Sequence, residues 1–190
     1  MSDQDSSLGP GWAIRSLPQP LTRGDARTLA HLSGSLFGDG YLTARQLQME
    51  APAVLLAIVD GNIAGWTTAY RWTGQNETPP RYYAMLQALD APVHWPLHVL
   101  GEIAVLPGYR RRGIGTALLR EALARHRHWA TLLWDRSDGA PNPFLRLAEA
   151  NGFSGQKRIP RYWEADSLQR KYVCPACQGT CHCDALLMWR

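Results

Sequence analysis

The sequence lacks any long hydrophobic run. Its longest, residues 53–59, is far shorter than the roughly 20 residues that cross a bilayer, so we expect no membrane span and no membrane partner. The first dozen residues lack the basic start and apolar stretch of a secretory signal, which predicts a cytoplasmic protein. Neither charge is in large excess, because 20 Lys and Arg residues stand against 16 Asp and Glu residues. The net charge of +4 is too small to indicate nucleic-acid binding by itself.

Cysteine is absent outside one short segment. All four cysteines lie between Cys174 and Cys183, where metal or redox chemistry explains them better than a disulfide framework in a reducing compartment. What the chain does contain fits one globular domain: 190 residues, of which 45% are hydrophobic and 19% are charged. We expect residues 1–11 to form a flexible tail, residues 12–190 to form a single domain, and residues 174–183 to be a cysteine-rich insert.

Hydrophobic patterning and turn residues predict strands and helices in a mixed order. The predicted strands are residues 12–17, 53–59, 63–71, 97–105, 130–134, 156–163 and 185–189. The predicted helices are residues 25–36, 43–49 and 114–128, one that begins at Pro143 and ends before Gly152, and a helical turn within 81–89. Otherwise residues 72–96 are expected to be a long loop. This mixture favours an α/β fold in which helices cover a mixed sheet.

The most informative stretch is a strand–turn–helix. The strand ends at Val105, the turn carries Arg110, Arg111 and Arg112, and the helix opens near Gly113. The unpaired N–H groups of a helix start carry the positive end of the helix dipole, and glycines there let a phosphate approach the backbone. The arginines add positive charge beside the same spot. This stretch therefore predicts a pyrophosphate site, although it lacks the Gly-Lys-Ser/Thr ending of a P-loop.

The same stretch resembles the acetyl-CoA signature of the GCN5-related N-acetyltransferase (GNAT) superfamily, Arg/Gln-x-x-Gly-x-Gly/Ala. Arg110, Gly113 and Gly115 fill that pattern. The residues that match the preceding Val-x-Pro-x-Tyr-Arg pattern are Val105, Pro107, Tyr109 and Arg110. An Asn that opens a helix ending in Gly-Phe is a second family element, and Asn142 with Gly152-Phe153 matches it.

The resemblance implies a GNAT-like α/β fold: a mixed, mostly antiparallel central sheet of about seven strands with about four helices on both faces. It implies transfer of an acetyl group from acetyl-CoA to a primary amine by direct attack in a ternary complex. The acceptor would be a small molecule or a peptide, not a nucleic acid, and the protein a monomer or homodimer. Such a protein would place its oxyanion donor near Val105, on a bulged strand. The residues implied to contact acetyl-CoA are Ile103, Ala104, Val105, Arg110, Arg111, Arg112, Gly113, Ile114, Gly115, Thr116 and Asn142.

Glu102 is the candidate general base, because it lies in an otherwise apolar strand at a position where relatives often carry a carboxylate. A structural Glu bonded to backbone or to an arginine explains the residue equally well. His94 and His98 are weaker candidates, since a histidine in that loop is more often solvated.

The general acid is harder to assign. Many relatives carry a tyrosine six residues after the Asn of the second family element, where this chain has Ala148. A water molecule, the low basicity of the departing thiolate, or a tyrosine from the C-terminal part of the chain would have to substitute. The two tyrosines considered are Tyr162 and Tyr172.

The cysteine segment resembles a zinc knuckle. Cys174-Pro-Ala-Cys177, followed two residues later by Gly179, has the spacing of a turn that directs two sulfurs at one ion. Cys181 and Cys183 would lie on one face of the following strand and complete a tetrahedral set for a structural zinc. Redox pairing and unligated thiols are the alternatives.

Two other functions compete with an acetyltransferase. One is a non-catalytic acyl-CoA-binding module, or a metal or redox sensor on the same fold, which the cysteines and the missing tyrosine favour. The other is nucleic-acid binding through the arginine run and through residues 125–128, which dipole complementarity at a helix end explains more simply. The aromatic loop residues hint at a partly apolar cleft, although such residues pack on a sheet just as often: Trp72, Tyr82, Tyr83 and Trp95.

Overall fold

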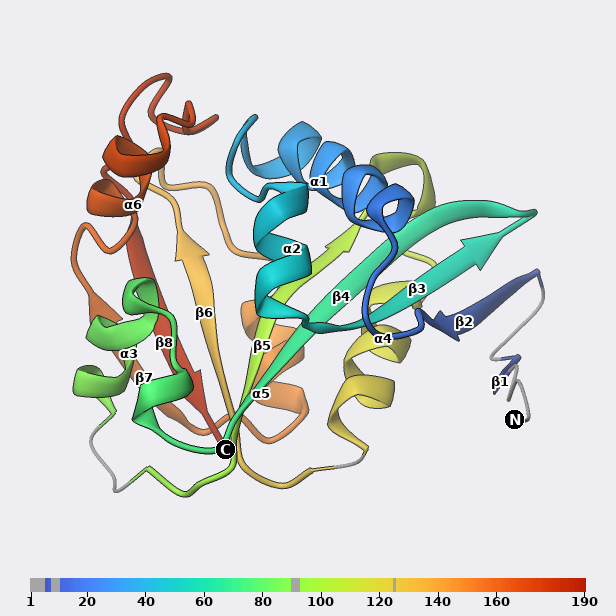
Figure 1. Ribbon diagram of the computed structural model, residues 1–190, viewed down its shortest axis with the longest axis horizontal. Coiled ribbons are helices and arrows are strands. Elements are labelled where there is room, and N and C mark those ends of the chain that lie inside the picture. Colours follow the sequence, from blue (N-terminus) through green and yellow to red (C-terminus); the bar gives the residue numbers. More distant parts are fainter. Residues whose placement is uncertain (1–5, 8–10, 90–92, 125) are drawn as a thin grey trace.

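The computed structural model describes residues 6–7, 11–89, 93–124 and 126–190, and within them one twisted sheet runs through the whole molecule (Figure 1). Its strand order is β1-β2-β3-β4-β5-β6-β8-β7, and every neighbouring pair is antiparallel except β5 with β6. The strands are β1 (Ser6–Ser7), β2 (Trp12–Ser16), β3 (Ala53–Val59), β4 (Asn62–Trp72), β5 (Leu97–Val105), β6 (Trp129–Asp135), β7 (Gly155–Ile159) and β8 (Asp184–Trp189). The predicted mixed, mostly antiparallel sheet is confirmed.

Helices cover both faces of this sheet (Figure 1). The described residues contain α1 (Arg23–Phe37), α2 (Ala44–Glu50), α3 (Tyr83–Ala88), α4 (Ile114–Leu123), α5 (Leu145–Ala150) and α6 (Glu164–Arg170), with three short 3-10 turns. Leucines of α1 and α2 pack with Leu56 and Trp66 on one face. Leucines of α4 pack with Trp129 and Met188 on the opposite face. None of the described helices is long and apolar enough to cross a membrane.

The hairpin of β3 and β4 forms as predicted, because Asp60 and Gly61 adopt the positive φ angles, 48° and 77°, that a tight turn of this type requires. The expected N-terminal tail is partly outside the described residues. Within it, residues 6 and 7 pair with β2 at the sheet edge, and residues 1–5 and 8–10 lie outside the part that the structure describes.

Two predicted elements differ from the structure. The strand predicted at 156–163 ends at Ile159, since Pro160 offers no N–H and Arg161 has a positive φ of 49°. The chain then forms α6, which the sequence analysis missed. The helix predicted at 114–128 ends at Leu123, where the chain turns back to enter β6. The helical turn predicted within 81–89 is present, as α3.

The two central strands separate part-way along their length. The parallel strands β5 and β6 pair only from His98 with Trp129 to Leu100 with Thr131. Beyond Leu100 their facing edges are no longer joined, and Figure 1 shows them diverging toward the upper part of the sheet. Unpaired strand edges carry backbone N–H and C=O groups that need partners, so this gap is suited to hold an extended polar ligand.

A β-bulge lies at the point of separation. Leu100 pairs with Ala69 and Ile103 with Thr67, so two residues of β5, Gly101 and Glu102, stand opposite a single residue of β4. Only glycine fits the first of these, because a Cβ at 101 would lie 2.7 Å from the Thr68 hydroxyl. The predicted bulge is therefore present, at Gly101–Glu102.

The α1–α2 connection packs closely on the cysteine segment. Gly38, which ends α1 with a φ of 107°, lies so near the chain at 173 that a Cβ would overlap the Val173 carbonyl oxygen. The next glycine, Gly40, lies against Tyr172. Both close approaches join the end of α1 to the chain before β8.

We expect Gly38→Ala to lower the free energy of unfolding by about 1–3 kcal/mol, because the new methyl group meets a carbonyl oxygen and the backbone angle suits glycine alone. Urea denaturation measures this change. Gly74→Ala is the matched control, since Gly74 has an extended φ of −169° and open space around it. Equal stability of the two variants would contradict the close packing.

Candidate active site

One cavity of about 840 Å³ occupies the gap between β5 and β6. Its walls are the separated strand edges, the start of α4, the end of α1 and the segment that follows α6. The predicted site residues that line it are Glu102, Ile103, Ala104, Val105, Arg110, Arg111, Gly113, Ile114, Gly115, Thr116, Asn142, Tyr172, Cys174 and Cys181. Arg112 and Tyr162 do not line it. Residues about 80 positions apart in sequence therefore meet at one cavity.

At one end, the cavity meets the first turn of α4. Gly113 caps this helix with a φ of 81° and supplies no side-chain hydrogen bond, and the first intrahelical donor is the Ala117 N–H at 3.0 Å from the Gly113 oxygen. The N–H groups of residues 114–116 are thus the orphan donors of the helix start. A Cβ at Gly113 would meet nothing within 4 Å, so the space in front of these donors is open.

The three arginines beside this turn differ in their contacts. Arg110 donates from Nε to the Val105 carbonyl oxygen at 3.0 Å and so ties the turn to the end of β5. Arg111 lines the cavity with a positive φ of 63°, and exposed Arg112 points outside the cavity lining. Orphan N–H groups, the helix dipole and Arg111 together make this end of the cavity suited to a diphosphate.

Asn142 lies across the cavity from the α4 turn and is held by two hydrogen bonds. Its Nδ2 donates to the Trp134 carbonyl oxygen at 3.0 Å, and its Oδ1 accepts the Phe144 N–H at 2.9 Å. The side chain therefore fixes the path from β6 into α5. It contributes part of the cavity wall.

Glu102 lies deep in the cavity wall and is only 6% exposed. Its Oε1 accepts a hydrogen bond from the Ser33 hydroxyl of α1, and its Oε2 accepts the Trp66 indole N–H at 2.8 Å. Burial raises the pKa of Glu102, and these two hydrogen bonds offset part of the rise. A carboxylate with a raised pKa at a cavity wall is the arrangement that a general base near neutral pH requires.

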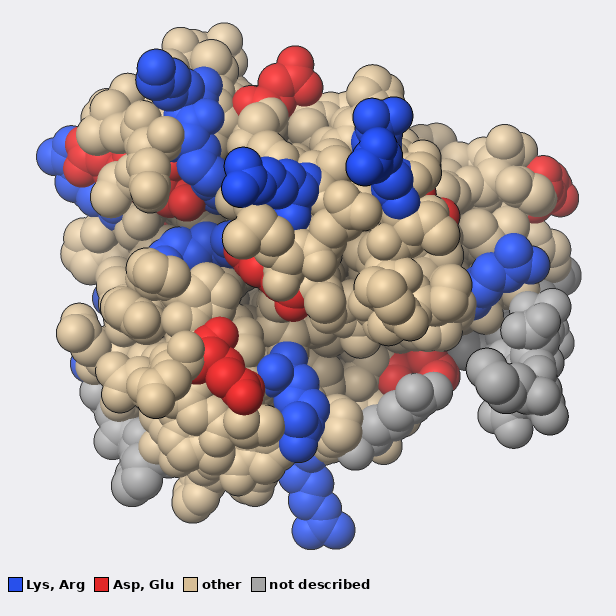
Figure 2. Space-filling view, in the orientation of Figure 1, with Lys and Arg blue, Asp and Glu red and all other residues tan. Residues whose placement is uncertain are grey.

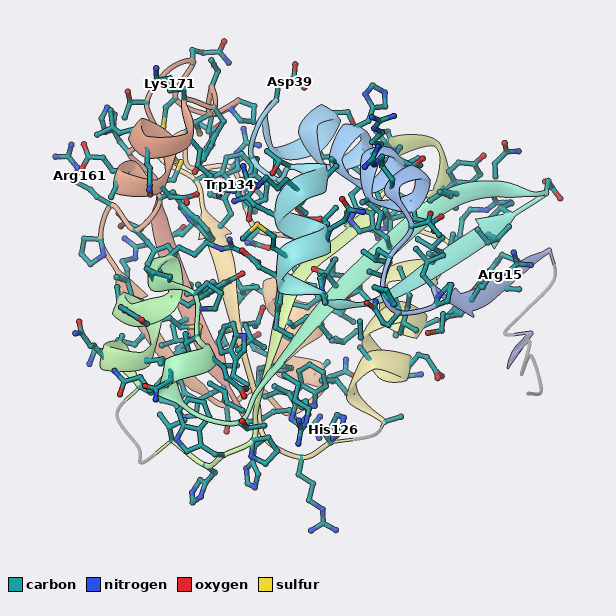
Figure 3. All side chains as sticks on the ribbon, viewed as in Figure 1. Arg15, Asp39, His126, Trp134, Arg161 and Lys171 are labelled. Atoms are coloured by element: carbon teal, nitrogen blue, oxygen red, sulfur yellow. The ribbon has the colours of Figure 1, made fainter. Side chains whose placement is uncertain are left out.

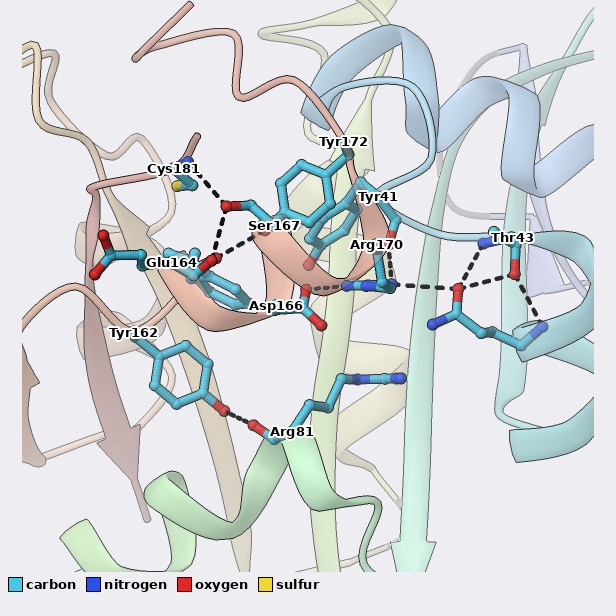
Figure 4. A network of polar contacts seen from close by, with 12 residues as sticks. Tyr41, Thr43, Arg81, Tyr162, Glu164, Asp166, Ser167, Arg170, Tyr172 and Cys181 are labelled. Atoms are coloured by element: carbon cyan, nitrogen blue, oxygen red, sulfur yellow. Dashed lines mark hydrogen bonds and ion pairs between the residues drawn. The ribbon is translucent and has the colours of Figure 1, made fainter. Parts of the chain in front are cut away.

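The tyrosines differ in their placement. Tyr172 lines the cavity and donates to the Trp163 carbonyl oxygen at 3.4 Å. Tyr162 instead donates to the Arg81 carbonyl oxygen at 2.6 Å and packs in a separate core cluster (Figure 4), so we no longer consider it a general acid. Ala148 is completely buried in the core beneath α5.

A tyrosine that the sequence analysis missed also lines the cavity. Tyr41 comes from the α1–α2 connection, and burial raises its pKa, with the Glu102 carboxylate adding to the rise. Its phenol therefore stays protonated and is able to donate. No sequence motif marks Tyr41, because it reaches the cavity only through the packing of two distant segments.

The histidines lie away from the cavity. His98 is buried at the beginning of β5 and stacks on His126, with 3.5 Å between ring centroids, and burial lowers its pKa to about 4. Figure 3 labels His126 at the end of the sheet opposite Trp134, which lines the cavity. His94 is exposed and stacks on His128. Neither candidate base is near Glu102.

The four cysteines lie together beside the cavity, with all four sulfurs within 4.8 Å of one another. The distance from the Cys183 sulfur is 3.6 Å to that of Cys177 and 3.9 Å to that of Cys174. Four sulfurs at about 2.3 Å around a tetrahedral zinc are roughly 3.8 Å apart, so the spacing fits such an ion. Burial opposes ionisation of Cys177, but hydrogen bonds from the His182 N–H and Ser137 lower its pKa to about 7.

The aromatic loop residues do not line the cavity. Trp72 and Tyr82 are buried in the core beneath α3, and Tyr83 and Trp95 are exposed. The aromatic residues that do line it near Glu102 come from elsewhere in the chain: Phe37, Tyr41, Trp134, Trp163 and Tyr172.

Comparison with known proteins places this architecture in one class. Its fold is similar to Arabidopsis thaliana NAA60 in complex with a bisubstrate analogue (TM-score 0.60, 16% identity, 93% of this chain and 97% of that one). It is similar to a GNAT family acetyltransferase from Elizabethkingia anophelis with acetyl-CoA bound (TM-score 0.58, 17% identity, 95% and 98%). A third similar structure is the ribosomal-protein-alanine N-acetyltransferase from Brucella melitensis (TM-score 0.55, 13% identity, 93% and 98%).

The fold is thus one that these acetyltransferases share. The family model described as "Acetyltransferase (GNAT) family" matches residues 26–153, and the chain belongs to this family. No curated protein matches the chain significantly in sequence.

Proposed function

We propose that the protein is an N-acetyltransferase, which transfers an acetyl group from acetyl-CoA to a primary amine by direct attack in a ternary complex. The observation that carries this proposal is the continuity of one cavity, which joins the anion-binding turn of α4 to the buried Glu102 carboxylate. The family match and a similar structure that holds acetyl-CoA support the identity of the acyl donor.

The residues present fit coenzyme A. The N–H groups of residues 114–116 and Arg111 would hold the diphosphate. The extended arm would then follow the unpaired edges of β5 and β6, where the backbone offers amide partners. The acetyl carbonyl would reach the bulge, near the edge residues 103–105 whose N–H groups are the candidate oxyanion donors.

The chemistry needs one base and one acid. Glu102 takes a proton from the acceptor ammonium, and the freed nitrogen attacks the acetyl carbon to form the C–N bond. When the tetrahedral intermediate collapses, the C–S bond breaks and the coenzyme A thiolate leaves with the electron pair. The nitrogen loses a second proton as the amide forms, and this proton restores the acid that protonates the thiolate. Of the three tyrosines that line the cavity, Tyr109 lies in the turn before α4, and Tyr41 and Tyr172 are our candidates to return a proton to that sulfur, in place of the tyrosine missing at Ala148.

A non-catalytic acyl-CoA sensor is the competing proposal, and the cysteine cluster beside the cavity favours it. Nucleic-acid binding is less well supported. Figure 2 shows Lys and Arg side chains of this face spread among uncharged residues rather than merged into one basic surface. We further propose a structural zinc held by Cys174, Cys177, Cys181 and Cys183, which would fix the chain between α6 and β8.

Glu102→Gln is expected to lower turnover at neutral pH by at least tenfold and to leave acetyl-CoA affinity within about twofold, because the amide accepts no proton but keeps the shape. The wild-type rate should rise with pH through the raised pKa of Glu102, and the variant should lose that dependence. Thiol release from acetyl-CoA with a panel of primary amines measures both. Thiol release by no amine would favour the sensor, and an unchanged pH profile in the variant would remove Glu102 as the base.

Gly113→Val is expected to weaken acetyl-CoA binding by at least tenfold, because the branched side chain would occupy the open space in front of the α4 donors. Calorimetry with acetyl-CoA measures the affinity. Gly61→Val is the matched control, since Gly61 has nearly the same φ, 77° against 81°, and equally open surroundings on the β3–β4 turn. Equal affinities of the two variants would contradict the diphosphate site.

Protein purified without added metal should contain about one zinc per chain. Cys177→Ser should lower that content, because serine is a poor zinc ligand. Ser137→Ala is the control: Ser137 contacts the Cys177 sulfur at 3.2 Å but is not a ligand, so this variant should retain the metal. Elemental analysis that finds no stoichiometric zinc in the wild type would defeat the proposal.

A further inference from the structure

Five aromatic side chains form a continuous wall at the end of the cavity beyond Glu102. We call the part of the cavity that they enclose the aromatic chamber. Its side chains are Phe37, Tyr41, Trp134, Trp163 and Tyr172, all of which line the cavity. Tyr41 joins them, with ring centroids 5.4 Å from Phe37, 6.2 Å from Trp163 and 5.6 Å from Tyr172. Phe37 lies 6.4 Å from Trp134. In Figure 3, Trp134 lies between the α1–α2 connection and the α6 segment.

The chamber adjoins the candidate base. Glu102, Tyr41 and Trp163 line both the main cavity and a small cavity of about 20 Å³ next to it. An acceptor whose nitrogen reaches Glu102 would therefore place the group that carries this nitrogen against the aromatic rings.

The charges around the chamber restrict what that group can be. Glu102 is the only acidic side chain among the described residues that line the cavity. Two cations contact rings of the chamber: Arg136 lies over the Trp134 ring, and Arg170 lies over Tyr41 and Tyr172. These arginines pair with acids of their own, Asp138 and Asp166, as Figure 4 shows for Arg170. Arg81 lines the small cavity together with Glu102, and it pairs with Glu50.

A polycationic acceptor is therefore a poor match. One of its ammonium groups could pair with Glu102, but the described cavity lining offers the others no second carboxylate, and Asp138 and Asp166 are already paired with Arg136 and Arg170. Apolar contact, in contrast, is plentiful, because burial of an aromatic group against five rings removes a large area from water.

We infer that the acceptor is a primary amine with a single positive charge, carried by a compact apolar or aromatic group that fills the aromatic chamber. This inference rests on the proposed function and specifies its substrate class. Two sources share this chemistry: a free arylalkylamine, and the amino end of a peptide whose first side chain is large and apolar.

The experiment compares thiol release from acetyl-CoA with 2-phenylethylamine, ethanolamine, spermidine and kanamycin, and with two peptides that begin with Phe and Ser. We expect kcat/KM for 2-phenylethylamine or the Phe peptide to exceed that for the hydrophilic counterpart by roughly 10- to 100-fold, as burial of an aromatic group implies. The better of these two acceptors identifies the source. Faster reaction with spermidine, kanamycin or ethanolamine would overturn the inference and leave the acetyltransferase standing. Thiol release by none of them, with acetyl-CoA bound normally, would overturn the inference for these acceptors and count against the proposed function.

Two variants test the chamber itself. Phe37→Leu and Trp134→Leu should each raise KM for the preferred apolar amine by about tenfold and leave KM for acetyl-CoA within twofold. Tyr83→Leu is the control, because it removes a ring that is 41% exposed and lies outside the cavity. An equal KM in both chamber variants and the control would contradict this placement of the acceptor.

Discussion

The architecture of the cavity depends on the short stretch over which the parallel strands β5 and β6 are hydrogen-bonded to each other. β5 and β6 pair for three residues each and then part, so beyond Leu100 and Thr131 their facing backbone groups lack a partner on the other strand. The bulge at Gly101–Glu102 turns β5 at this point, and Thr67 and Thr68 satisfy its backbone, with hydrogen bonds of 2.8 Å to the Glu102 carbonyl oxygen and N–H. The cavity, the candidate base and the turn into α4 all follow from this one separation.

The two ends of the cavity are formed by different kinds of groups, backbone at one end and side chains at the other. At α4, the site consists of backbone: donors of a helix start, a left-handed glycine and open space in front of it. At the aromatic chamber, it consists of side chains from segments that meet only in the folded chain. A backbone site tolerates much change in sequence around it, whereas a side-chain site changes with every substitution. This separation of a backbone site from a side-chain site would allow related proteins to keep one acyl donor and to differ in their acceptors.

This division also explains what the sequence predicts. The strand–turn–helix from Glu102 to Gly115 is contiguous, so its glycines and arginines can be recognised as a motif. The family match confirms the GNAT resemblance that this motif carried. The strands and the β3–β4 hairpin can be predicted from the sequence because their hydrophobic and turn patterns are local. Tyr41 and Trp134 carry no such signal, since only tertiary packing brings them to Glu102. α6 was missed because the aromatic residues before it resemble a continuing strand.

The close contact between the end of α1 and the chain at Val173 has a practical consequence. Cys174 is the next residue, and it is both a wall of the cavity and one of the four clustered thiols. Oxidation of these thiols during purification would therefore displace a segment that lines the cavity. Acceptor specificity measured on an oxidised preparation would differ from that of the native protein. The content of free thiols should therefore be quantified with every kinetic series.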